Sequence, residues 1–168
     1  PLGYVPAASL PLTILFTLAH FNVDAWLPTL TGLAVIYFLA GLALRGNKDW
    51  SYVLRNSALT LGTALSLAAL VTLKETGGWY ALVAGLLFIA EMYLRKDGVF
   101  EIGAPVLFTL GIFLILRDFN IERITYHLLA YSLVWIVEDI LAHLTFANPR
   151  PVNLIVRFIG GGLALMNY

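Results

Sequence analysis

Long runs of apolar residues separated by short polar breaks are the dominant pattern along this chain. The runs predict seven helical segments, most of them near the ~20 residues that a helix needs to cross the ~30 Å core of a bilayer. Because the runs are continuously apolar and lack the alternation of barrel strands, helices are favoured over a β-barrel. The predicted segments are residues 5–20, 25–45, 52–73, 78–95, 103–116, 122–145 and 152–166.

Two of the segments contain uncharged runs that are short for a membrane span. Residues 102–116 and 124–137 are each nearer to about 15 residues than to 20. A re-entrant or interfacial segment is therefore an alternative to a full crossing at these two places.

The breaks between the runs are rich in residues that end helices. Residues 46–49, 76–78, 96–98 and 148–151 contain Gly, Pro, Asn or Asp, and all of them except 76–78 also carry charge. Such short connections make successive helices antiparallel neighbours and leave no room for a separate soluble domain. Residues 1–168 are therefore expected to form a single transmembrane helical domain.

The composition supports this all-α integral membrane fold and excludes several functions. Hydrophobic residues make up 60% of the chain and charged residues 12%, with a mean hydropathy of +0.86, which is more apolar surface than a soluble domain of 168 residues could bury. The net charge of zero and the scattered basic residues argue against a nucleic-acid partner. The absence of cysteine excludes disulfides and thiolate chemistry.

Basic residues are distributed unevenly between alternate breaks, which predicts the orientation of the chain in the membrane. Under the positive-inside rule, the more basic group of breaks is cytoplasmic. This places the N-terminus inside and the C-terminus outside, and we expect a bacterial inner-membrane location. The breaks after the second, fourth and sixth segments carry Arg45, Lys48, Arg55, Arg95, Lys96 and Arg150, whereas the alternate breaks carry Lys74, Arg117 and Arg123.

A weak internal repeat predicts tandem antiparallel helical hairpins. Residues 21–23 read Phe-Asn-Val and residues 119–121 read Phe-Asn-Ile, while Gly62, Gly111 and Gly160 recur at a spacing of 49. The unit is then one hairpin of about 49 residues. Its frame leaves the first segment without a partner, so the chain can be a fragment of a longer array. Chance similarity is the alternative, because apolar helices use few residue types.

Ionisable residues inside the predicted segments are the candidates for function, because burying a charge in a membrane is costly. Glu91 precedes Arg95 by four positions, and Asp139 precedes His143 by four, so each pair shares a helix face. The simplest interpretation of both pairs is a neutralised helix end.

The last predicted hairpin contains an arginine that needs an acidic partner. At 1.5 Å per residue, Glu138 lies ~15 Å before the turn at residues 148–151 and Arg157 lies ~9 Å after it. We therefore predict an ion pair from Arg157 to Glu138 or Asp139. The pair could hold the hairpin together or form part of an ion path. The holding role is favoured, because a path needs polar groups at several depths.

Cofactor and enzyme chemistry have little support in the sequence. His20 and His127 both fall near the same predicted surface and could ligate a haem or chlorophyll-type pigment if they faced each other, but an interfacial histidine is the simpler interpretation. Otherwise we expect no cofactor, and no metal site, phosphate loop or nucleophile motif is present in the sequence. The last segment also lacks the lysine of a retinal Schiff base.

These observations predict a non-enzymatic structural or assembly subunit of a membrane complex, surrounded by lipid and bound to other membrane-protein subunits. The alternative is a small-solute or proton-coupled ion transporter whose path includes Glu91, Glu138 and Asp139. An intramembrane enzyme ranks third.

Overall fold

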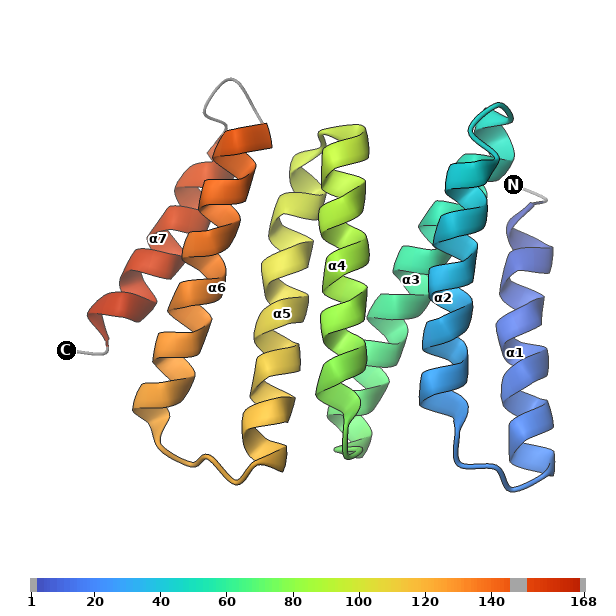
Figure 1. Cartoon of the computed structure of the whole chain (residues 1–168), viewed down its shortest axis with the longest axis horizontal. Coiled ribbons are helices and arrows are strands. Elements are labelled where there is room, and N and C mark those ends of the chain that lie inside the picture. The colour runs from blue at the N-terminus through green and yellow to red at the C-terminus, as the bar shows by residue number, and fades with distance from the viewer. Residues whose placement is uncertain (1–2, 146–150, 167–168) are drawn as a thin grey trace.

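The computed structural model of the chain is all-helical over the residues that it describes, 3–145 and 151–166. Its elements are α1 (Tyr4–His20), α2 (Trp26–Ala43), α3 (Lys48–Thr72), α4 (Gly77–Arg95), α5 (Gly98–Asp118), α6 (Ile124–Thr145) and α7 (Pro151–Leu165). Successive helices run antiparallel in one elongated row, with α1 and α7 at its two ends (Figure 1). The predicted helical class is confirmed.

Five of the described helices, α2 to α6, are long and apolar enough to cross a membrane. Helix α1 has 17 residues, and the apolar part of α7 over Leu154–Leu165 is shorter still. The chain therefore has the build of a multi-pass membrane protein. Seven crossings remain a prediction.

The fifth predicted segment was placed too late and made too short. Helix α5 begins at Gly98 and has 21 residues, because the Asp97 side chain accepts a hydrogen bond from the Val99 amide at 3.2 Å and caps the helix. Helix α6 likewise has 22 residues. Both helices are long enough to span, so a re-entrant segment is not needed to explain either of them.

Helix α3 also begins earlier than the predicted segment. The Asn47 side chain accepts a hydrogen bond from the Trp50 amide at 3.3 Å, and the helix starts at Lys48 instead of Tyr52. The early start adds Ser51 to the helix and moves Arg55 from the first turn to the second. Both residues contribute to the site described below.

Helices α1, α3 and α5 end in the same way. A residue with a left-handed backbone lies at the C-cap of α3, Leu73 (φ 48°), and directly after the C-caps of α1 and α5, at Asn22 (φ 52°) and Asn120 (φ 54°). In each case the next amide bonds to the carbonyl five residues back, and the left-handed residue bonds three back, which is the Schellman arrangement. The two Phe-Asn sequences thus form one type of helix end. The 49-residue repeat itself stays a prediction.

The loops joined to these three helix ends are bonded to one another. Lys74 forms an ion pair with Asp24 of the preceding loop at this end. Arg117 donates to the Leu73 carbonyl at 2.8 Å, and the Thr76 amide donates to Asp118 at 3.0 Å. These contacts connect three loops on the side of the row where α1 ends and α2 begins, which we call the α1–α2 end of the helices. The opposite end, where α2 ends and α3 begins, is the α2–α3 end.

Small residues allow the closest approach between helices. A Cβ added to Gly78 of α4 would lie 2.5 Å from the Gly111 carbonyl oxygen of α5, so the two glycines let these backbones touch. The predicted series of glycines does not share one role, however. Gly111 and Gly160 face the preceding helix, whereas Gly62 faces Ala84 of the following helix.

Candidate functional site

Three carboxylic residues are buried within about two turns of the α2–α3 end. Glu91 on α4 and Glu101 on α5 are 0% exposed, and Glu138 on α6 is 2% exposed. They come from three successive helices. Because a buried carboxylate is costly without a partner, their surroundings define the candidate site.

Glu91 is held by two arginines from two helices. Arg55 of α3 approaches Glu91 Oε2 at 3.3 Å, and Arg95 of α4 forms an ion pair with Glu91 Oε1 from one turn away on the same helix. The side chains of the two arginines are 15% and 18% exposed. The pairing of Arg55 with Glu91 joins α3 to α4, and two guanidinium groups on one carboxylate leave an excess of one positive charge.

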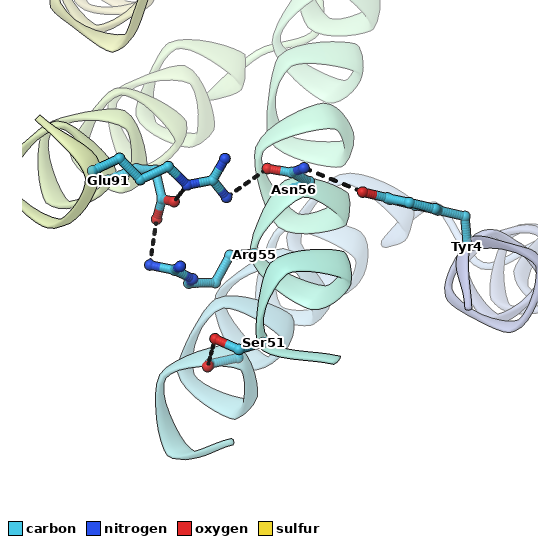
Figure 2. A network of polar contacts seen from close by, with 7 residues as sticks. Tyr4, Ser51, Arg55, Asn56 and Glu91 are labelled. Atoms are coloured by element: carbon cyan, nitrogen blue, oxygen red, sulfur yellow. Dashed lines mark hydrogen bonds and ion pairs between the residues drawn. The ribbon is translucent and has the colours of Figure 1, made fainter. Parts of the chain in front are cut away.

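The network extends from Arg95 to the first helix. Arg95 Nη2 donates to Asn56 Oδ1 at 2.6 Å, and Asn56 Nδ2 donates to the hydroxyl of Tyr4 at 3.2 Å (Figure 2). The Arg95 guanidinium also lies over the Tyr52 ring, 4.4 Å from its centroid. One connected set of polar contacts therefore joins α1, α3 and α4.

A close contact between α2 and α3 positions Arg55. A Cβ on Gly41 would lie 2.6 Å from Arg55 Cγ, so glycine is the residue that lets the arginine stem pass along α2. The Ser51 hydroxyl donates to the Gly41 carbonyl at 2.6 Å and ties the same two helices together. The Arg55 side chain thereby extends from α3 to Glu91 of α4.

Arg157 was predicted to pair with either Glu138 or Asp139, and the structure pairs it with Asp139. Arg157 Nε of α7 donates to Asp139 Oδ2 of α6 at 2.9 Å, and its Nη2 lies 3.3 Å from His143 Nδ1. Successive residues on a helix point about 100° apart, and the face carrying Asp139 and His143 is the one that meets Arg157. Asp139 and His143 converge on the arginine together. Of the two predicted partners, Asp139 and not Glu138 forms the ion pair with Arg157.

Glu138 is buried in different surroundings from those of Asp139. It lies close enough to Glu101 of α5 for the two carboxyl groups to interact electrostatically. Its Oε1 atom is buried and makes no hydrogen bond to any described residue. Two neighbouring carboxyl groups in a buried position are chemically able to hold a proton or a cation between them.

Sequence reasoning missed two members of the site, Arg55 and Glu101. Arg55 was counted with the basic residues of a break although it falls inside the predicted third segment, and Glu101 was left outside the fifth segment. The caps at Asn47 and Asp97 carry the signal for both, since an Asn or Asp before a helix-compatible run marks the first turn. The approach of Arg55 to Glu91 is a tertiary contact, which local sequence patterns do not predict.

The two candidate pigment ligands do not come together. His20 lies on α1 and His127 on α6, toward opposite sides of the row (Figure 1). Both ring nitrogens of His127 have polar neighbours, the Tyr131 hydroxyl at 3.0 Å and the Ile121 carbonyl at 2.6 Å. Over the described ranges, no group of three or more His, Asp or Glu residues is arranged to hold a metal ion.

No protein-family model, curated protein or solved structure matches this chain.

The arginine pairing of Glu91 predicts a strong stability effect. Glu91→Gln should lower the free energy of unfolding by about 3 kcal/mol, because two largely buried arginines lose their charged partner. Adding Arg55→Gln to this variant should cost less than Arg55→Gln costs in the parent. Thermal or denaturant unfolding in mild detergent measures both quantities.

The control for this experiment is Glu75→Gln, which removes an exposed carboxylate from the α3–α4 loop. We expect a change within about 0.5 kcal/mol for that variant. Equal losses from Glu75→Gln and Glu91→Gln, or strictly additive effects of Glu91→Gln and Arg55→Gln, would contradict the pairing.

Proposed function

We propose that the chain is a non-enzymatic structural or assembly subunit of a larger membrane complex. In this proposal all seven helices cross a bacterial inner membrane as tandem hairpins, with the N-terminus in the cytoplasm and the C-terminus outside. The excess of basic residues at the α2–α3 end supports that orientation. The three matching helix ends at Asn22, Leu73 and Asn120 support the hairpin unit.

The absence of cysteine from the sequence makes the orientation directly testable. A single cysteine at Gly46→Cys, in the α2–α3 loop, should react with a membrane-impermeant maleimide only after bacterial cells are permeabilised. A single cysteine at Glu75→Cys, in the α3–α4 loop, should react in intact cells. Reversed labelling would contradict the orientation, and labelling of both from one side would contradict a crossing by α3.

The observation that carries the assembly proposal is the open surface of the last hairpin. Gly160 of α7 packs against α6, where an added Cβ would lie 3.2 Å from Trp135 Cβ, but Gly161 and Gly162 have no atom within 4 Å of the corresponding position. These two glycines could accept the close approach of another helix. Helix α6 is also the least covered of the five long helices, with 22% of its membrane-length window buried against 39% to 44% for the others.

Filling this open surface tests the proposal. The parent chain, purified from native membranes in mild detergent, should elute as a large complex. Gly161→Leu/Gly162→Leu should elute as a smaller species with unchanged helical content, because its side chains obstruct the partner and nothing within the chain. Gly32→Leu on α2 is the matched control, since an added Cβ there also meets nothing within 4 Å. A parent that elutes as a lone monomer would reject the complex-subunit function.

A proton-coupled transporter is the second candidate function. It is favoured by one observation, the buried Glu138 beside Glu101, with a carboxyl oxygen that no described residue binds. Glu91 fits a path less well, because its two arginines already neutralise it. Asp139 is similarly engaged by Arg157.

Proton movement can be measured directly without knowledge of a co-transported solute. Vesicles containing the purified chain and an internal pH dye should acidify faster than empty vesicles under an imposed membrane potential. Glu138→Gln should abolish the difference, whereas Glu75→Gln should preserve it. Parent vesicles that behave like empty ones would reject proton transport, and an undiminished rate in Glu138→Gln would remove this residue from any path.

A further inference from the structure

A hollow at the α2–α3 end is lined by three cationic side chains. It has a volume of about 380 Å³, which lies in the range of small-molecule sites. Arg45 lies in the loop before α3, Lys48 is the first residue of α3, and Arg55 lies in its second turn. Leu94 contributes from the last turn of α4. The lining residues are Arg45, Lys48, Ser51, Tyr52, Arg55 and Leu94.

The positive charge of this hollow is not compensated within the described chain. Arg45 and Lys48 are exposed and form no ion pair with any described residue. Arg55 shares the single carboxylate of Glu91 with Arg95. The nearest further acid in sequence, Asp49, lines the adjacent hollow beside Trp50. An anion would therefore be attracted here.

The donors of the hollow are partly preorganised. Contacts with Gly41 and Glu91 fix the stem and the Nη1 atom of Arg55, and its Nε atom makes no hydrogen bond to the described residues. Ser51 and Lys48 belong to the first turn of α3, where the helix dipole also favours negative charge. Arg45 and Lys48, on either side of the Gly46 turn, supply two exposed cations.

We propose that this hollow binds a phosphate group at the membrane surface. Guanidinium and ammonium groups make short, charge-assisted hydrogen bonds to phosphate oxygens. Basic pockets between membrane helices near the cytoplasmic surface are suited to the head groups of anionic lipids. The same chemistry would accept free phosphate, so the ligand is a phosphate group from one of these two sources. This binding is independent of the assembly proposal.

Lipid binding to the intact chain tests the proposal. Native mass spectrometry from detergent, with titrated phosphatidylglycerol, should show retained lipid, and phosphatidylcholine should bind at least ~10-fold more weakly because its head group carries no net charge. Arg45→Gln/Lys48→Gln should weaken phosphatidylglycerol binding by at least ~10-fold, since each cation near an anionic surface is worth about 1 kcal/mol. Both positions are exposed, so the variant should fold.

The matched control removes two positive charges elsewhere. Lys96→Gln/Arg123→Gln combines an exposed cation of the same end, outside the hollow, with one of the opposite end. Its affinity for phosphatidylglycerol should stay within about twofold of the parent. An equal loss in both double variants, or equal binding of phosphatidylglycerol and phosphatidylcholine, would overturn the proposal.

Inorganic phosphate distinguishes the two sources of the ligand. If millimolar phosphate displaces phosphatidylglycerol from the parent, and itself binds in a way that Arg45→Gln/Lys48→Gln abolishes, the hollow is a site for free phosphate. If phosphatidylglycerol stays bound at that concentration, the head group of a lipid is the ligand. Absence of binding by both probes would overturn the proposal.

Discussion

The cost of placing charge among apolar helices is the constraint on which the α2–α3 end of this structure depends. Glu91 is fully buried, and Arg55 and Arg95 approach it from two helices and offset the cost of burying the carboxyl group. The requirement fixes the register of α3 against α4. It also explains Gly41, because a side chain at that position would occupy the space that the Arg55 stem needs.

The polar contacts at the α1–α2 end and at the α2–α3 end of the helices differ in how deeply they are buried. At the α1–α2 end, the loops are joined by the ion pair of Lys74 with Asp24 and by bonds to backbone groups, as where Arg117 donates to the Leu73 carbonyl. At the α2–α3 end, side chains meet side chains, and the pairs lie one or more turns inside the helices. Chemistry that needs a buried or uncompensated charge is therefore concentrated at the α2–α3 end.

Much of the helical order could be predicted from the sequence, because apolar runs and Gly- or Asn-containing breaks act locally. Asn22 and Asn120 were recognisable as turn residues, and both adopt the left-handed backbone that asparagine tolerates. Leu73 takes the same backbone without a matching residue type, so its helix end could not be aligned with the other two. There the contacts of the surrounding loops, including the bond from Arg117 to its carbonyl, outweigh local preference.

The site was harder to predict because its members meet across helices. The spacing of Glu91 and Arg95 was visible as one helix turn, but the approach of Arg55 depends on how α3 packs against α4. For Arg157, depth in the membrane was the right criterion, but it could not distinguish Glu138 from Asp139. The choice of Asp139 followed from rotation about the α6 axis. Two adjacent acids thus have different surroundings, since Asp139 pairs with Arg157 and Glu138 is buried within electrostatic reach of Glu101.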